Sequence, residues 1–215
     1  MDCNTYNILY KRFLKRGPGQ MLDLAGFKAG DSFLDLCTGT GRASFEVFKR
    51  GASNVVAVDK DGEKLSRRFG EEMFCGMTVR QFFDEHKDMK FDCIFCQQAI
   101  NYWLKEEGYV KDSIAKLVAK ALTSNGKFVF NTFNKEPSEE IIVKEYKLDG
   151  LHYAEVSQLV GGIVHHGQFC DGAHPDHQEF AWISSEEFMT ILKPYFKTIT
   201  IHSDGPTDIY VCSNI

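Results

Sequence analysis

The stretch Phe33-Leu34-Asp35-Leu36-Cys37-Thr38-Gly39-Thr40-Gly41-Arg42 decides the fold, because an apolar run leads into a glycine turn and then into a helical pattern. Glycine adopts positive φ at little cost and lets a ligand approach the backbone closely. The stretch lacks the third glycine of a dinucleotide fingerprint and the Gly-Lys-Ser/Thr of a P-loop. Asp35, at the end of the run, would repel a pyrophosphate and attract a cationic group. The stretch therefore predicts a ligand without phosphate.

Outward from this stretch, short β-branched or aromatic runs alternate with longer helical patterns. Strands are predicted over residues 32–37, 54–59, 77–81, 91–96 and 127–133, and helices over residues 42–50, 64–74 and 110–122. Such alternation predicts a parallel sheet covered by helices on both faces, with ligands at the carboxyl ends of the strands.

After residue 140 the pattern changes to two-residue alternation with turn signals at Asp149-Gly150 and Gly161-Gly162, which predicts consecutive hairpins. A strand over residues 178–183, a helix over 184–192 that begins with a capping box, and strands over 197–203 and 208–213 follow. The fold class expected is α/β: a Rossmann-like sandwich with a mostly parallel seven-stranded sheet, an antiparallel final hairpin and an antiparallel β insertion after the fifth strand.

We expect a single domain over residues 1–215. Its parts are an N-terminal helical cap (1–30), a cofactor-binding core (31–140), an antiparallel insertion that covers the substrate (141–183), and a final helix with edge strands (184–215).

The composition limits the functional classes. With 43% hydrophobic and 26% charged residues, the chain has the profile of a soluble globular protein. The formal net charge of −5 disfavours a polyanionic partner, so no nucleic acid is expected. No apolar run approaches the length of about 18 residues that a membrane span needs, and no signal peptide is evident. The seven scattered cysteines suit reduced thiols in the cytoplasm. The protein is expected to be a monomer or a homodimer.

A second acidic residue, Asp59, ends the run Asn54-Val55-Val56-Ala57-Val58. A carboxylate at the end of the second strand can accept hydrogen bonds from both hydroxyls of a ribose. Asp35 and Asp59 together indicate a ligand that has an ammonium group and a ribose but no phosphate. S-adenosylmethionine fits this description.

Residues 35–42 together with 55–59 resemble motifs I and II of the class I S-adenosylmethionine-dependent methyltransferases. Residues 91–103 are similar to the motif of that family at the fourth strand, and residues 123–133 to its step into the fifth strand. The resemblance implies S-adenosylmethionine as methyl donor, S-adenosylhomocysteine as product, and a small-molecule acceptor methylated on nitrogen or oxygen.

The resemblance also implies roles for single residues. Asp35, Gly39 and Gly41 would border the methionine part, Asp59 the ribose and Lys60 the adenine. Gln81 would offer its side-chain amide and Phe82 a backbone donor to the edge of the adenine. The residues expected to bind the cofactor are Tyr10, Asp35, Cys37, Gly39, Gly41, Asp59, Lys60, Gln81, Phe82 and Cys96.

The insertion is expected to select the acceptor. His165 and His166 are neighbours in a predicted strand, so their side chains point to opposite faces and at least one can face the cleft. A histidine there can remove a proton near neutral pH, although either histidine can instead simply bond to a neighbour. The catalytic candidates are His165, His166 and Tyr102, and the substrate candidates are Gln97, Asn101, Tyr102 and His152. The irregular spacing of the histidines and Cys170 predicts no metal site.

Three alternatives stay open. Residues 96–102 (CQQAINY) echo a segment of cap-type RNA guanine methyltransferases. A NAD-linked reductase can share the same layout of strands and helices. A regulatory protein that binds the cofactor without catalysis would keep the same pocket.

Overall fold

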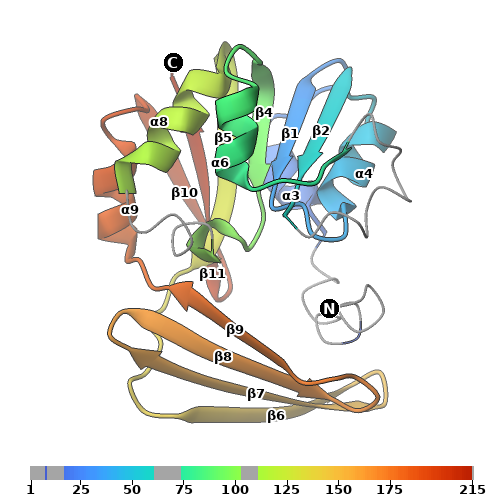
Figure 1. The fold of residues 1–215 in the computed structure, drawn as a ribbon, viewed down its shortest axis with the longest axis vertical. Helices are drawn as coiled ribbons and strands as arrows, with labels where there is room; N and C mark the ends of the chain where they lie inside the picture. The colour runs from blue at the N-terminus through green and yellow to red at the C-terminus, as the bar shows by residue number, and fades with distance from the viewer. Residues whose placement is uncertain (1–7, 9–16, 61–73, 103–110, 215) are drawn as a thin grey trace.

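The computed structural model describes residues 8, 17–60, 74–102 and 111–214, with side chains from Ile114 onward in the last range. Its main sheet has seven strands in the order β10-β11-β5-β4-β1-β2-β3 (Figure 1). The strands are β1 (Ser32–Leu36), β2 (Asn54–Val58), β3 (Phe74–Cys75), β4 (Phe91–Cys96), β5 (Leu122–Phe133), β10 (Thr198–Asp204) and β11 (Thr207–Ser213).

Five strands of this sheet run parallel. β1 pairs with β2 and β4, β2 with β3, and β4 with β5, all in parallel, whereas β11 is antiparallel to both β5 and β10. The chain order reverses on either side of β1, which creates a switch point at the carboxyl ends of β1 and β4. The predicted sheet with its antiparallel final hairpin is confirmed.

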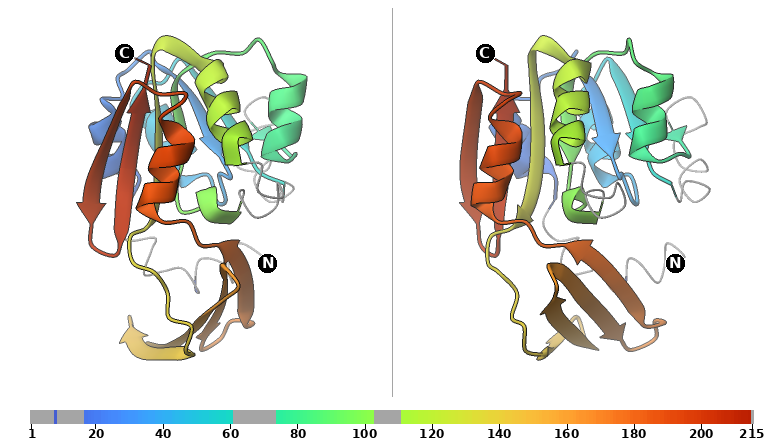
Figure 2. Two further views of the ribbon diagram at one scale, coloured as in Figure 1. Left: turned by 90° about the vertical axis from the view of Figure 1, so that its left-hand side faces the viewer. Right: turned by 60° about the vertical axis from the view of Figure 1, so that its left-hand side comes forward.

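Helices cover both faces of the sheet (Figure 2). On one face α3 (Gly19–Ala25) and α4 (Arg42–Lys49) bury Met21, Leu22 and Val47. On the other face α6 (Val79–Glu85), α8 (Lys111–Ala121) and α9 (Ser185–Leu192) pack over a larger apolar core. The predicted capping box of α9 is present at Ser184 and Glu187. Among the described helices, none is long and apolar enough to cross a membrane.

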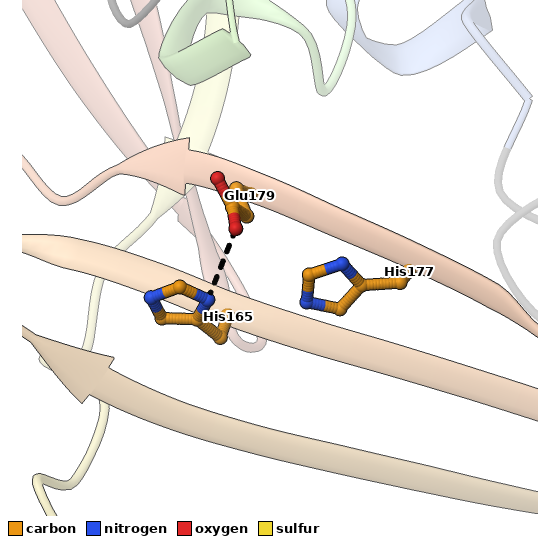
Figure 3. Close-up of side chains that lie close together, drawn as sticks. All are labelled: His165, His177 and Glu179. Atoms are coloured by element: carbon orange, nitrogen blue, oxygen red, sulfur yellow. Dashed lines mark ion pairs between the residues drawn. The ribbon is translucent and has the colours of Figure 1, made fainter.

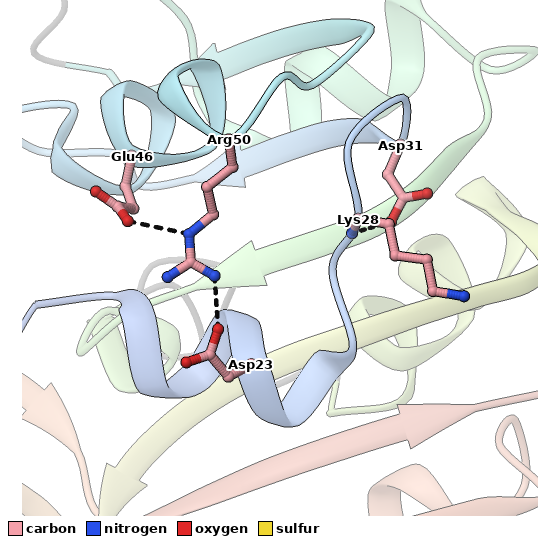
Figure 4. A network of polar contacts seen from close by, with 5 residues as sticks. All are labelled: Asp23, Lys28, Asp31, Glu46 and Arg50. Atoms are coloured by element: carbon pink, nitrogen blue, oxygen red, sulfur yellow. Dashed lines mark hydrogen bonds and ion pairs between the residues drawn. The ribbon is translucent and has the colours of Figure 1, made fainter.

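A polar network ties α3 to α4 on the surface (Figure 4). The guanidinium of Arg50 donates to the carboxylates of Asp23, at 2.6 Å, and Glu46, at 3.0 Å. These two hydrogen bonds raise the pKa of Arg50 above its ordinary value. The network therefore links α3, which precedes β1 in the chain, to α4, which follows it.

The insertion forms a second sheet, which we call the flap sheet. Its strands are β6 (Ile142–Leu148), β7 (Leu151–Val160), β8 (Ile163–Cys170) and β9 (Asp176–Ala181), antiparallel and in that order. Both predicted turns are present, with Asp149-Gly150 and Gly161-Gly162 at positive φ. The flap sheet lies apart from the main sheet, beyond the carboxyl ends of its parallel strands (Figure 1).

One predicted strand is wrong. Residues 77–81 do not continue a strand, because the Thr78 side chain accepts from the backbone N–H of Gln81 while the Gln81 side chain accepts from the backbone N–H of Thr78. This capping box starts α6 at Val79, and the third strand is the short Phe74–Cys75. Most of the helix predicted over 64–74, and half of the N-terminal cap predicted over 1–30, lie outside the described residues, and the described half of the cap contains α3.

Candidate active site

The glycine loop between β1 and α4 turns the chain through three left-handed residues. Gly39 and Gly41 have φ of 56° and 72°, and Cys37 has a φ of 55° although it carries a side chain. A non-glycine residue in this region is strained, and such strain is concentrated at functional sites. The loop is joined to β2, because the backbone N–H of Thr38 donates to the carbonyl of Val58.

Asp35 lies beneath the glycine loop. Asp35 is only 2% exposed. Its Oδ2 accepts hydrogen bonds from the hydroxyls of Thr38, at 2.6 Å, and Ser44, at 2.7 Å. The backbone N–H of Ser44 also donates to this oxygen. Burial raises the pKa of Asp35 to about 6 in spite of these hydrogen bonds. Asp35 therefore supports the loop from within the protein, and its predicted place beside the methionine part of the cofactor stays a prediction.

Asp59 holds the same loop from the end of β2. Its Oδ2 accepts from the backbone N–H of Gly39 at 2.8 Å, and the residue is half-buried. Lys60, which follows it, is exposed. The loop is thus fixed by one buried carboxylate and by a second carboxylate at its surface. Asp59 keeps its predicted place at the carboxyl end of the second strand.

Cys37 and Cys96 meet under the loop. Cys96 ends β4 and is fully buried, and Cys37 packs against the core that contains it. The hydrogen bond with Cys37, together with burial, raises the pKa of the Cys96 thiol well above its ordinary value. Its side chain is buried among protein atoms, and contact of Cys96 with the cofactor stays a prediction.

The two residues predicted at the edge of the adenine both make hydrogen bonds at the start of α6, and their contact with the adenine stays a prediction. The amide oxygen of Gln81 accepts from the backbone N–H and the hydroxyl of Thr78. Phe82 is buried, and its backbone N–H donates to the carbonyl of Thr78. Both groups are used to start α6, and residues 76–78 are the ones that directly follow the third strand. Tyr10 lies outside the described residues.

A pocket opens at the carboxyl ends of β4 and β5. It has a volume of about 280 Å³ and is lined by Gly17, Gly19, Gln20, Met21, Gln97, Gln98, Asn131, Asp204, Thr207 and Ile209. Gln98 has a φ of 55°, and its backbone N–H donates to Oδ1 of Asn131 at 2.7 Å. The structure thus places Gln97, a predicted substrate residue, in a pocket wall. Gln98 and Asn131 carry no local signal in the sequence, because only the pairing of β4 with β5 brings them together.

Asn101 joins the main sheet to the flap. It is 5% exposed, its Nδ2 donates to the carbonyl of Ala181 at 2.9 Å, and its Oδ1 accepts from the hydroxyl of Thr132 at 2.7 Å. Both ends of the amide are therefore engaged within the protein, and contact of Asn101 with a substrate stays a prediction. Tyr102 donates its hydroxyl to Gln178 of β9, and its ring packs against Phe180. The structure places it where the flap meets the sandwich.

Strand pairing separates the flap sheet into two faces. The inner face contains Phe180, whose ring lies 5.6 Å from that of Phe133 in β5. The other residues of the inner face are Ile142, Lys144, Tyr146, Leu148, Leu151, Tyr153, Glu155, Ser157, Leu159, Val164, His166, Gln168, Cys170, Asp176 and Gln178. The outer face carries His152, His165, Phe169, His177 and Glu179.

The two faces of the flap sheet carry different histidines. His165 and His152 lie on the outer face of the flap sheet, opposite to the face that carries Phe180, and their roles in catalysis and substrate binding stay predictions. His166 lies on the inner face, half-buried. Burial lowers the pKa of His166, so its imidazole is uncharged at neutral pH.

A polar patch occupies the middle of the inner face. At its centre Gln168 is 3% exposed, and within the described residues neither its amide nitrogen nor its amide oxygen has a hydrogen-bond partner. Glu155 pairs with Gln168 from β7 and Asp176 from β9, and His166 lies two residues along the same strand. The amide is thus a buried donor and acceptor near two carboxylates and the imidazole of His166. The hydroxyl of Tyr146 donates to Glu155, and Lys144 lies opposite Glu155 across the β6–β7 pair. The sequence showed no signal for this patch, because it depends on the register of three strands.

Three outer-face residues form a separate cluster (Figure 3). One ligand atom from each of His165, His177 and Glu179 lies within 4.8 Å of the others. Nδ1 of His165 lies 3.3 Å from Oε1 of Glu179. Because the cluster is on the outer face, it is separate from the glycine loop and the polar patch.

The arrangement of the main sheet, glycine loop and flap agrees with known proteins. A family model described as "Methyltransferase domain" matches residues 27–193. The chain belongs to this methyltransferase domain family, so the prediction of the family and of an enzyme is confirmed. No curated protein matches the sequence at a significant level.

Solved structures share the fold over the whole chain. An S-adenosylmethionine-dependent methyltransferase from Clostridium acetobutylicum has 16% identity, 98% coverage of each chain and a TM-score of 0.68. DesVI from Streptomyces venezuelae has 16% identity, 100% coverage of each chain and a TM-score of 0.71. CalS10 from Micromonospora echinaspora, an amino pentose methyltransferase with S-adenosylmethionine bound, has 14% identity, coverage of 92% and 88%, and a TM-score of 0.70.

Proposed function

We propose that the protein transfers a methyl group from S-adenosylmethionine to the amine nitrogen of a small hydroxylated acceptor, such as an amino sugar. The observation that carries the choice of acceptor is the buried amide of Gln168, which lacks a partner in the described part of the chain. Membership of the methyltransferase family supports the reaction. The solved neighbour that is an amino pentose methyltransferase supports the class of acceptor.

The residues of the glycine loop fit the proposed cofactor. Asp35 and Asp59 put two carboxylates next to one loop, which disfavours a pyrophosphate and favours a cation. Asp59 lies half-buried at the carboxyl end of β2, where a ribose would meet it. Asp35 beside the glycine turn and the match to the methyltransferase family model argue against a NAD-linked reductase, whereas an acid at the position of Asp59 suits the ribose of either cofactor. Cys37, Gly39, Gly41, Asp59 and Lys60 remain our candidates for direct contact with the cofactor, S-adenosylhomocysteine being the product.

The polar patch fits an acceptor that carries both an amine and hydroxyl groups. A hydroxyl both donates and accepts, so it can satisfy the two ends of the Gln168 amide. The carboxylates of Glu155 and Asp176, on either side, favour a basic amine over a neutral or acidic group. Gln97, in the wall of the pocket at the end of β4, would contact the acceptor from the main sheet.

The chain mainly positions the reactants. When bound, S-adenosylmethionine supplies an activated methyl group, whose carbon bonds to the acceptor nitrogen as its bond to sulfur breaks and leaves the electron pair on sulfur. His166, uncharged at neutral pH, accepts the proton that the nitrogen loses and passes it to solvent. Asp35 and Asp59 hold the loop in the geometry for transfer, and the flap excludes water.

The remaining features agree with this assignment. The net charge of −5 disfavours RNA, so we propose a small molecule rather than capped RNA as the acceptor. Every cysteine within the described residues is a free thiol, which suits a reducing compartment. We propose that the protein acts in the cytoplasm, without nucleic acid or membrane, as a monomer or homodimer.

The test is a panel of acceptors incubated with the purified protein and S-adenosylmethionine, with release of S-adenosylhomocysteine as the readout. The panel pairs each amino sugar with the same ring lacking the amine and with an aliphatic amine lacking hydroxyls. We expect turnover only where amine and hydroxyls occur together, and none with Asp59→Ala. Turnover of the aliphatic amine at equal kcat/KM, or of a capped RNA alone, would overturn the proposed acceptor class.

A further inference from the structure

We propose that the outer face of the flap sheet binds a divalent transition-metal ion of the Zn²⁺ type through His165, His177 and Glu179. The site is separate from methyl transfer, and its ligands come from two neighbouring strands. It therefore adds a second binding function, whose role is to join β8 to β9.

The pairing of β8 with β9 brings the three residues together. His165 lies directly opposite Glu179, and His177 lies opposite Gly167. His165 and His177 are therefore on the same face of neighbouring strands, and their ring centroids are 6.0 Å apart with an interplanar angle of 19°. Figure 3 shows the two rings and the carboxylate of Glu179 grouped over the strands.

The distances suit a tetrahedral ion. Zn²⁺ binds imidazole nitrogen and carboxylate oxygen at about 2.0–2.2 Å, which places neighbouring ligand atoms about 3.3 Å apart. The distance of 3.3 Å between Nδ1 of His165 and Oε1 of Glu179 already has this value. All three ligand atoms lie within 4.8 Å of one another, so His177 needs only a side-chain rotation to complete a face of the tetrahedron.

The surroundings suit an ion that arrives from solvent. The side chains of His165 and Glu179 are 40% and 37% exposed, which leaves the fourth position open to water. Two imidazole nitrogens and one carboxylate oxygen form a donor set that favours zinc over the oxygen-binding Mg²⁺ and Ca²⁺. Binding fixes the backbone of β8 from outside, at the residue next to His166 on the inner face.

The experiment uses tag-free protein stripped with EDTA and titrated with Co²⁺, followed by visible absorption, and with Zn²⁺, followed by calorimetry. The variants are His177→Ala and Glu179→Gln. The matched control is His152→Ala, which removes a histidine from the same face outside the cluster. We expect one ion per chain and intense tetrahedral Co²⁺ bands. Each cluster variant should weaken binding by at least about tenfold, since even supporting partners of a metal site have effects of that size.

A second measurement does not depend on variants. In the unaltered protein, Zn²⁺ should shift the imidazole NMR signals of His165 and His177 and leave that of His152 unchanged. Equal weakening by His152→Ala, no saturable binding, or unchanged signals of His165 and His177 would overturn the site. Binding of S-adenosylhomocysteine by the same samples is expected to be unaffected, so failure of the metal site leaves the proposed methyl transfer untouched.

Discussion

The glycine loop and the inner face of the flap sheet treat their buried polar groups differently. In the loop, Asp35 accepts from Thr38 and Ser44, so the buried carboxylate is satisfied by the protein itself. In the flap, the amide of Gln168 is buried without a partner among the described residues. A buried unsatisfied amide destabilises a protein by about 1–3 kcal/mol. We infer that the cofactor end of the site is preformed and that the acceptor end is completed by its ligand.

The largest effect is expected for Asp59→Ala, which tests the cofactor half of the comparison. The change removes the acceptor for the Gly39 N–H and the proposed partner of the ribose. Loss of hydrogen bonds to a charged group should weaken the binding of S-adenosylhomocysteine by about 3 kcal/mol, a factor of more than 100. Calorimetry with Asp23→Ala as control measures this, since Asp23 is exposed and remote from the loop. Equal affinity of the two variants would exclude Asp59 from the cofactor site.

Asn101→Ala tests how the two regions are joined. The substitution leaves the carbonyl of Ala181 and the hydroxyl of Thr132 without their buried partner. We expect the free energy of unfolding in urea to fall by about 2–3 kcal/mol. Asn134→Ala is the control, because its amide bonds Gly205 and Asp208 at a more exposed position. A fall no larger than that of the control would show that Asn101 does not join the flap to the main sheet.

Gln168→Met tests the acceptor half directly. Methionine has nearly the shape of glutamine but no amide to satisfy, so the free energy of unfolding should rise by about 1–2 kcal/mol. Affinity for S-adenosylhomocysteine should stay unchanged while kcat/KM for the acceptor falls. Gln158→Met, on the outer face of β7, is the matched control. A stability loss in Gln168→Met would mean that the amide has a partner in the free protein.

The pH dependence of cofactor binding tests the charge under the loop. Burial raises the pKa of Asp35 from 3.8 to about 6, so this group alone makes the free protein less stable as pH rises through that range. A cationic cofactor favours the charged carboxylate, so affinity should increase severalfold as pH rises through about 6. Calorimetry across this range should show the increase, and Asp35→Asn should flatten it. A profile that is unchanged in Asp35→Asn would assign the effect to another group.

The smallest effect is expected for Arg50→Ala, far from both regions. Its hydrogen bonds to Asp23 and Glu46 are at the surface, where such pairs contribute about 0.2–1 kcal/mol. Urea unfolding should shift by this amount, less at high salt, with cofactor binding unchanged. A loss of cofactor affinity would show that the α3–α4 network supports the loop.

The same contrast explains what the sequence could predict. The main sheet and the hairpins follow from local patterns: apolar runs, glycine turns and the caps of helices. The strand predicted over residues 77–81 was wrong because the same segment has both the alternation of a strand and the residues of a capping box. The hydrogen bonds of Thr78 with Gln81 favour the helix.

The site was predictable only where it depends on chain order. Asp59 follows a strand whose place in the sheet is fixed, so its position next to the glycine loop was foreseeable. The burial of Asp35 and Cys96 depends on packing across β1 and β4, which periodicity does not show. The register of β7, β8 and β9 decides that His166 rather than His165 lies on the inner face. The same register places the amide of Gln168 where no described residue bonds to it.

A crystal structure of the protein with S-adenosylhomocysteine tests the central claim most directly. We predict that both ribose hydroxyls lie within hydrogen-bond distance of Asp59, and that the sulfur faces the space between Gln97 and the inner face of the flap sheet. A nucleoside bound away from Asp59, or a sulfur turned from His166 and Gln168, would contradict the division into a preformed cofactor end and a ligand-completed acceptor end.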